Sequence, residues 1–421
     1  MSIYLAIFLV TFLFALLFTP LAGRAGHKMG TVDKPRELSI HTETIPRSGG
    51  LVFFFAFLLP SIYLITNSLL TSLERRLLAG IMGGGLFIFA IGLLDDLKEI
   101  SPLKKFIWEI IASIIPIAFG LHFGFLPQWW ISLPLTIFYL VGGANALNLS
   151  DGMDGLATGM SAIILGFFSL LSLSSGNHLA LAISLILLGI SLGFLYHNFY
   201  PAKIFLGDGG SLFLGFNLAC IALIFSNRPY DFKWVLAPLL ILFIPVADTA
   251  SALLRRFREK RDLFTGDRSH IYDILQHKIL NKTTEFYIKN REKFSEIPWG
   301  VPMKSGRASQ CDSVANTLKH RNLNKATELH PDFIGVKICV NLWLNILKKK
   351  GFAHQTTVIS MYVFSGIYGV IGLGFTRLTQ SQSIIFAILI IIFSTWGMQR
   401  LWVFGHRNSN TKNLPPLAGS R

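Results

Sequence analysis

The chain has 421 residues, of which 52% are hydrophobic and only 14% are charged. A soluble domain carries about 25% charged residues, so this chain cannot cover itself with a hydrated surface. A disordered or collagen-like chain is excluded too, and three cysteines without a CxxC pair argue against a disulfide framework or a zinc knuckle. The composition predicts a polytopic membrane protein, in which the net charge of +15 is interpreted by its position rather than as nucleic-acid binding.

Eleven segments are apolar enough to cross a bilayer, whose core needs about 17–25 helical residues. They lie near residues 2–19, 51–66, 77–94, 106–126, 129–144, 156–173, 179–197, 211–226, 234–253, 357–375 and 383–404. The segment 129–144 is the weakest, because Pro134 and two glycines interrupt it. Residues 1–19 lack a basic start and a small-residue cleavage site, so we expect a retained first helix. The fold class predicted is an all-α polytopic membrane protein with about eleven transmembrane helices.

The loops between these segments fall alternately on two sides of the membrane. One set contains nearly all of the Lys and Arg residues and comprises 20–50, 95–105, 145–155, 198–210, 254–356 and the C-terminal tail. The positive-inside rule makes this set cytoplasmic. The N-terminus is then outside and the C-terminus cytoplasmic. Most of the aspartates near helix ends lie in the same set, and several acids on one face among glycines predict a site rather than simple solvation.

The first motif is the pair Asp95-Asp96 at the end of a predicted helix, followed by Lys104 and Lys105. Adjacent carboxylates repel each other unless a cation lies nearby. A divalent cation or a lysine would relieve that repulsion. Two adjacent aspartates are a weak signal by themselves, because they can simply end a helix.

The second motif runs from Asn145 to Gly159 and places two amides, two acids and three glycines in one turn at the membrane edge. The amides are Asn145 and Asn148, and the acids are Asp151 and Asp154. Oxygens of Asn and Asp suit Mg²⁺, and a helix that starts near a glycine offers free N–H groups to phosphate. A plain polar turn would not explain the two amides on its apolar side.

The third motif, from Lys203 to Ser211, contains Phe205 and Asp208 and opens another helix. A lone acid there can be a cap. Next to the second motif, Asp208 is interpreted as a metal ligand, and Phe205 as an aromatic that could stack on a base. The alternative for Phe205 is a core aromatic.

The fourth motif runs from Thr265 to Asp273 and includes Arg268 and His270. It follows a basic run that starts at Arg255, which can equally be the positive flank of the ninth span. Arginine is suited to bidentate phosphate contacts. The four motifs on one cytoplasmic face predict a phosphorylated, nucleotide-like substrate and a partner that resides in the membrane.

These ordered motifs closely resemble the polyprenyl-phosphate N-acetylhexosamine-1-phosphate transferases. That superfamily includes the enzymes that start O-antigen, teichoic-acid and enterobacterial-antigen chains, the phospho-MurNAc-pentapeptide transferase and the dolichol-linked GlcNAc-phosphate transferase. The segments Val32–Pro35 and Ile45–Gly50 also look like its first cytoplasmic loop. The resemblance covers about residues 1–275 and resumes near 348–404.

The resemblance implies the reaction of a UDP-HexNAc with polyprenyl phosphate to give polyprenyl-diphosphate-HexNAc and UMP, in the inner (plasma) membrane with the active site on the cytoplasmic face. The implied cofactor is Mg²⁺, with Mn²⁺ as an alternative, and its implied ligands are Asn148 and Asp208. The implied catalytic residues are Asp95, Asp96, Lys105, Asp151 and Asp154. The implied substrate-binding residues are Asn145, Lys203, Phe205, Arg268 and His270. A homodimer stays open, and Glu109 is interpreted as an ordinary packing residue.

Two departures from the family pattern stand out. Tyr272 and Asp273 occupy positions where further histidines are common, which affects the choice of sugar more than the chemistry. Residues 276–347 have no counterpart and are predicted to be an inserted polar loop, between a catalytic core at 1–275 and two final spans with a tail at 348–421.

The sequence leaves several alternatives open. The lipid phosphate can attack directly, without an obligatory base, since its second pKa is near 6, or the reaction can pass through a covalent aspartyl-phosphate. A transporter or flippase of a phosphorylated lipid or nucleotide is the rival class, and it predicts acids near span midpoints. A CDP-alcohol phosphotransferase would need an aspartate spacing that is absent from residues 151–154.

Overall fold

The structure is a computed structural model that describes residues 2–33, 44–226, 231–260, 270–276, 278–279, 352–379, 381–386 and 388–390. The chain divides into two compact units. The first contains Met1–His270 and Val358–Ile392 and carries the candidate site. Most of the second, Ile271–Thr357 with Phe393–Leu417, lies outside the described residues, as does nearly all of the insertion predicted at 276–347.

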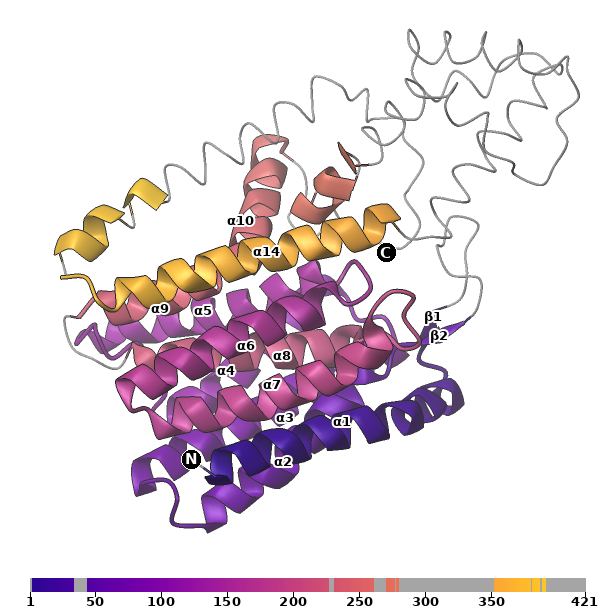
Figure 1. The fold of residues 1–421 in the computed structure, drawn as a ribbon, viewed down its shortest axis with the longest axis horizontal. Coiled ribbons are helices and arrows are strands. Elements are labelled where there is room, and N and C mark those ends of the chain that lie inside the picture. Colours follow the sequence, from indigo (N-terminus) through magenta and orange to yellow (C-terminus); the bar gives the residue numbers. More distant parts are fainter. Residues whose placement is uncertain are drawn as a thin grey trace, which may run out of the picture. The chain divides into compact units, whose positions relative to one another are not determined.

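The first unit is a bundle of long helices that lie side by side, in keeping with the predicted all-α class (Figure 1). In chain order the helices are α1 (Ser2–Met29), α2 (Gly49–Thr66), α3 (Ser72–Leu97), α4 (Pro102–Ala118), α5 (Trp129–Ser150), α6 (Leu156–Ser175), α7 (His178–Asn198), α8 (Gly207–Phe225), α9 (Lys233–Ile241), α10 (Phe243–Arg258) and α14 (Phe352–Phe375). Two short strands, β1 (Val32–Asp33) and β2 (Ile45–Pro46), pair antiparallel with Val32 opposite Pro46.

Eight helices of the described residues are long and apolar enough to cross a membrane, which makes this a multi-pass membrane protein. They are α1, α2, α3, α5, α6, α7, α8 and α14. α5 is continuous over its 22 residues although it contains Pro134. A ninth span is formed if α9 and α10, which meet at an angle of 79°, cross together.

The predicted count of eleven spans is therefore matched only in part. The span predicted at 106–126 corresponds to α4, which has 17 residues and ends at Ala118. Pro116 lies in its last turn, and Gly120 then turns the chain with a φ of 101°. The span predicted at 383–404 falls largely outside the described residues. The orientation of the two termini stays a prediction.

α8 lies at the centre of the bundle, and each of its residues from Gly207 to Phe225 is buried. It packs against α3, α5 and α2. Glycines let the backbones approach closely, as is usual between membrane helices. A Cβ on Gly92 of α3 would lie 2.5 Å from the carbonyl oxygen of Asp208, and one on Gly50 of α2 would lie 2.6 Å from the backbone nitrogen of Gly210. The first turn of α8 is thereby held against two neighbouring helices.

Candidate active site

The polar motifs meet at one end of the bundle. Asp96 lies in the last turn of α3 and Lys105 in the first turn of α4, whereas Asn148 lies in the last turn of α5 and Asp208 in the first turn of α8. Hydrogen bonds join the side chains of Asp95, Lys105, Asn148 and Asp208, and Asp96 accepts from the backbone of Asp208, so the structure brings the first three motifs of the sequence together. All of them lie at helix ends rather than in the middle of a span, where an acid is costly.

Asp208 is the centre of this cluster. Its side chain is 5% exposed, and Lys105 Nζ lies 2.9 Å from its Oδ2. On the other oxygen, Oδ1, Asn148 Nδ2 donates a hydrogen bond at 3.2 Å, and Arg47 Nη2 lies 3.5 Å away. A buried carboxylate needs partners of this kind to stay ionised.

Lys105 joins Asp208 to Asp95. Its ammonium donates to Asp95 Oδ2 at 2.9 Å as well as to Asp208 Oδ2. The other oxygen of Asp95 accepts the backbone N–H of Ile100 at 2.8 Å. The Asp95 carboxylate therefore faces the cluster with its orientation fixed by the turn between α3 and α4.

Asp96 differs from Asp95 because its carboxylate binds backbone N–H groups rather than Lys105. Its two carboxylate oxygens accept the backbone N–H groups of Asp208 and Gly209, both at 3.0 Å, so it caps the N-terminus of α8. Its side chain is 2% exposed, and Arg47 Nη2 lies 3.5 Å from it. Gly207 has a φ of 73°, and a Cβ there would lie 2.7 Å from Asp96 Oδ2. The cap thus requires glycine at this position.

Arg47 reaches the cluster because its segment is tied to the start of α8. The backbone N–H of Phe205 donates to Pro46 O at 2.9 Å, and the N–H of Gly49 donates back to Phe205 O at 3.0 Å. These bonds place Arg47 between Asp96 and Asp208. Phe205, half-buried, is held by its backbone in the same connection.

The amides of the second motif have separate partners. Asn148 Nδ2 donates to Ser211 Oγ at 2.8 Å in addition to Asp208. Asn145, one turn earlier on α5, donates to the carboxylate of Glu109 and to Val141 O at 3.0 Å. Glu109 is 1% exposed. It is therefore a partner of the site as well as a packing residue.

The acids of the second motif follow α5. Asp151 ends that helix, and burial raises the pKa of its carboxyl well above the usual range; Arg47 opposes the rise, and the carboxylates of Asp208, Asp96 and Asp154 add to it. Asp154 Oδ2 accepts the backbone N–H of Ala202 at 2.9 Å. Tyr362 of α14 donates its hydroxyl to Gly155 O at 2.6 Å. The turn is thus anchored from two sides.

The remaining predicted site residues are only partly placed with the cluster. His270 Nδ1 lies 2.8 Å from Asp248 Oδ2, and the two side chains are 4% and 0% exposed. Asp248 belongs to α10, which packs against α5. Lys203 is exposed, and its ammonium forms no ion pair within the described ranges. Arg268 lies outside the described residues.

Comparison with known proteins decides the family. Residues 78–226 match Glycosyl transferase family 4, a stretch that runs from α3 to the end of α8. Over 274 residues the chain is 36% identical to the probable undecaprenyl-phosphate N-acetylglucosaminyl 1-phosphate transferase of Bacillus subtilis (strain 168), covering 63% of this chain and 75% of that protein. The chain belongs to the polyprenyl-phosphate N-acetylhexosamine-1-phosphate transferase superfamily.

Two further members show the breadth of this transferase superfamily. The chain is 32% identical to the decaprenyl-phosphate N-acetylglucosaminephosphotransferase of Mycobacterium tuberculosis (strain ATCC 25618 / H37Rv), over 58% of this chain and 69% of that protein. It is 37% identical to a phospho-N-acetylmuramoyl-pentapeptide-transferase of Lactobacillus gasseri, over 50% of this chain and 69% of that protein. This protein is accordingly a multi-pass phosphosugar transferase.

The donor chemistry of the site fits the divalent cation that the superfamily implies. Three carboxylates, those of Asp95, Asp96 and Asp208, lie within ion-pair distance of Arg47 and Lys105. No three Asp, Glu, His or Cys side chains of the described chain are arranged as a ready metal cluster, and Lys105 lies between two of the carboxylates. Mg²⁺ uses one or two protein carboxylates and completes its shell with water and substrate phosphates, so such a cluster is not required.

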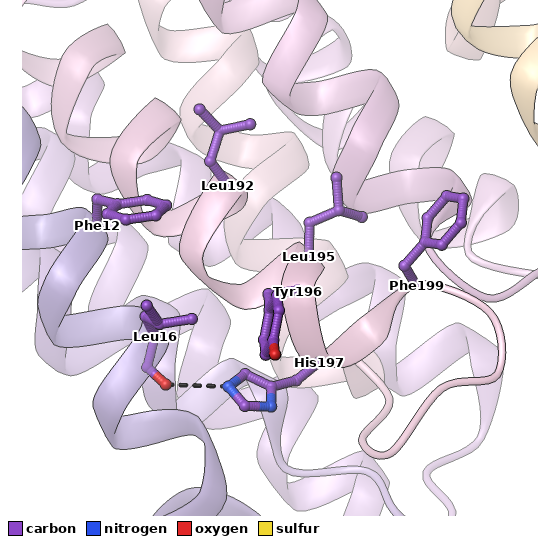
Figure 2. A pocket seen from close by; sticks show the side chains of 7 residues that line it. All are labelled: Phe12, Leu16, Leu192, Leu195, Tyr196, His197 and Phe199. Carbon is purple, nitrogen blue, oxygen red and sulfur yellow. Dashed lines mark hydrogen bonds between the residues drawn. The ribbon is translucent and has the colours of Figure 1, made fainter.

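An apolar pocket of ≈ 680 Å³ lies between α1 and α7 (Figure 2). Phe12 and Leu16 of α1 face Leu192 and Tyr196 of α7 across it. His197 Nε2 donates to Leu16 O at 3.0 Å at its edge. None of the predicted site residues lines this pocket.

The sequence assigned no part in the site to four residues that contact predicted site residues in the structure, namely Arg47, Glu109, Ser211 and Asp248. Arg47 lies in the segment that resembles the family's first cytoplasmic loop, which was the one available signal. Asn145, the partner of Glu109, lies on another helix, and His270, the partner of Asp248, lies 22 residues further along the chain, so the sequence carries no sign of these pairings.

Proposed function

We propose that this protein transfers a HexNAc-1-phosphate, most simply GlcNAc-1-phosphate, from a UDP-sugar to polyprenyl (undecaprenyl) phosphate and releases UMP. The reaction would take place on the cytoplasmic face of the inner membrane, as the first membrane step of an envelope polysaccharide. The observation that carries this proposal is the buried Asp208 carboxylate in contact with Lys105, Asn148 and Arg47. GlcNAc is preferred because the relatives from Bacillus subtilis and Mycobacterium tuberculosis are named for it.

In the proposed reaction, an oxygen of the lipid phosphate attacks the β-phosphorus of the UDP-sugar. The bond from the β-phosphorus to the bridging oxygen breaks, and UMP leaves with that oxygen. Lys105 and Arg47 neutralise charge on the phosphoryl oxygens, which is the main contribution a protein makes to such a transfer. The lipid phosphate is mostly dianionic at pH 7, because its second pKa is near 6, so this route needs no general base.

The carboxylates have positioning roles in this mechanism. Asp95 orients Lys105 through the 2.9 Å contact between them. Asp96 holds the first turn of α8, and with it Asp208. The acids lie at helix ends, which supports a transferase over the transporter alternative.

Asp208 and Asn148 are the residues proposed to hold Mg²⁺, with Mn²⁺ as a substitute. When bound, the ion would supply positive charge to the diphosphate as it transfers. Asn148 presents its amide nitrogen to Asp208, so it would act as a ligand through its other amide atom, the oxygen.

The test incubates membranes that contain the protein with polyprenyl phosphate and a panel of labelled UDP-sugars. The proposal predicts one lipid-linked HexNAc product, lost with EDTA and restored by Mg²⁺. Asp208→Ala should abolish it, and raising Mg²⁺ should rescue Asn148→Ala more than Asp208→Ala, because one ligand charge remains. Equal, metal-insensitive losses in both variants would argue against metal ligation by these two residues.

A further inference from the structure

Glu109 is a buried acid that the proposed reaction does not use. It lies on α4, four residues after Lys105, so the two side chains share one face of the helix. The residue is 1% exposed. Its Oε2 accepts a hydrogen bond from Asn145, whereas its Oε1 is buried without a hydrogen-bond partner among the described residues. Burying a carboxylate oxygen without a hydrogen bond costs free energy, and an apolar side chain would fill the same space without this cost. Packing alone therefore does not account for a carboxylate here.

The hydrogen bonds of Asn145 fix which way its amide faces. Its Nδ2 donates to the Glu109 carboxylate and to Val141 O. The carbonyl oxygen of Val141 can only accept a hydrogen bond, so the amide nitrogen is the atom that faces these two partners. The amide oxygen of Asn145 is therefore directed away from Glu109 and remains an acceptor for another group.

The Glu109–Asn145 pair forms a second layer beside the cluster. In the first layer, Lys105 of α4 and Asn148 of α5 both contact Asp208. Glu109 follows Lys105 by one helical turn, and Asn145 precedes Asn148 by one turn. The Glu109 carboxylate also lies within electrostatic range of Lys105, Asp208 and Asp95. The pair thus joins the two helices that supply the first layer.

We propose that Glu109 is a positioning residue for the transfer, which holds Asn145 so that its amide oxygen accepts a hydrogen bond from an N–H or O–H group of the sugar-nucleotide. This inference rests on the proposed function. Its ligand chemistry is specific: an oriented Asn145 can accept from the substrate but cannot donate to it, because both of its donor hydrogens are already used.

The test is a double-mutant cycle of kcat/KM for the UDP-sugar, measured on equal amounts of folded protein. Glu109→Ala should lower kcat/KM by about 100-fold, as expected when a reacting group is displaced by about 1 Å. Asn145→Ala should lower it to a similar extent. The double variant should be no worse than Asn145→Ala, because Glu109 acts through Asn145.

Two further variants separate positioning from packing and from charge. Glu109→Gln keeps an acceptor for Asn145 and should stay within about tenfold of the wild type. Ser113→Ala removes another buried hydrogen bond one turn along the same face of α4, from Ser113 Oγ to Glu109 O at 2.8 Å, and should leave kcat/KM within about twofold. Losses that multiply in the double variant, or a Ser113→Ala loss as large as that of Glu109→Ala, overturn the inference.

If Glu109→Ala does not fold, a reversed pair still decides the matter. Asn145→Asp places two carboxylates against each other, and adding Glu109→Gln restores a donor to that pair. The double variant should have a kcat/KM about tenfold higher than that of Asn145→Asp alone. An unchanged kcat/KM overturns the inference. If the wild-type protein makes no lipid-linked product, the proposed function is refuted and this inference with it. If the wild type is active but the losses of Glu109→Ala and Asn145→Ala add up in the double variant, the inference alone is refuted.

Discussion

Asp96 Oδ1 accepts a hydrogen bond from the backbone N–H of Asp208 at 3.0 Å. One aspartate of the adjacent pair therefore fixes the start of α8, which carries the central acid of the site. Asp95 instead turns its carboxylate to Lys105. The pair therefore divides two tasks between neighbouring residues. This division explains why two carboxylates occur together at the end of α3, although like charges next to each other are unfavourable.

The first prediction concerns the Asp96 cap. Asp96→Ala should reduce the free energy of unfolding by about 0.5–2 kcal/mol, the usual value of a cap, and should also abolish transfer by displacing Asp208. Asn177→Ala removes the cap of α7, where Asn177 Oδ1 accepts the N–H of Ala180 at 2.9 Å. That control should lose similar stability but keep activity, in thermal unfolding and turnover assays. Equal activity in both variants would disprove the role of Asp96.

The second prediction concerns the charge on Lys105. Lys105→Met should lower kcat by about 100-fold or more, because a preorganised cation at developing phosphoryl charge contributes this much. Lys104→Met is the matched control, since Lys104 is exposed and adjacent in sequence. Steady-state kinetics with the UDP-sugar should show a loss for Lys105 alone. A comparable loss at Lys104 would point to a general surface-charge effect.

Much of this site can be predicted from the sequence, because the residue types within three motifs already indicate phosphate and metal binding. The residue types and spacing at Asp95, Asn148 and Asp208 predict oxygen ligands at helix ends, and the structure places them together. Arg47 reaches the cluster only through backbone bonds between β2 and the segment before α8, which a linear pattern does not reveal.

The limits of prediction in the fold have similar physical reasons. Hydrophobicity located the helices, but it does not show where a helix bends. The span predicted at 234–253 is broken between α9 and α10 at Leu242, next to Pro238 and Pro245. The pairing of Glu109 with Asn145 was not predicted, because Asn145 lies on another helix.

The third prediction concerns the contact between α3 and α8. Gly92→Ala should reduce the free energy of unfolding by about 1–3 kcal/mol, as overpacking does, because the added Cβ would meet the backbone of Asp208 and Gly209. Gly166→Ala in α6 is the control, since a Cβ there meets nothing within 4 Å. Thermal unfolding in detergent compares the two. Tolerance of Gly92→Ala would contradict the close packing.

The fourth prediction concerns the side of the membrane on which the site lies. In a background without Cys220, Cys311 and Cys339, a cysteine at Ser101 should react with an impermeant reagent only from the cytoplasm. A cysteine at Ser68, in the exposed turn between α2 and α3, should react only from outside. Both expectations follow from the distribution of Lys and Arg among the loops. Reaction of Ser101 from outside would overturn the proposed topology.

The most direct test of phosphosugar transfer uses UDP-GlcNAc that carries its radioactive label on the β-phosphorus. Membranes with the wild-type protein and polyprenyl phosphate should move the label into the lipid fraction and release unlabelled UMP, and Asp208→Ala membranes should do neither. Label that stays in water as UDP while the sugar moves to the lipid would mean glycosyl rather than phosphosugar transfer, and would contradict the proposed reaction.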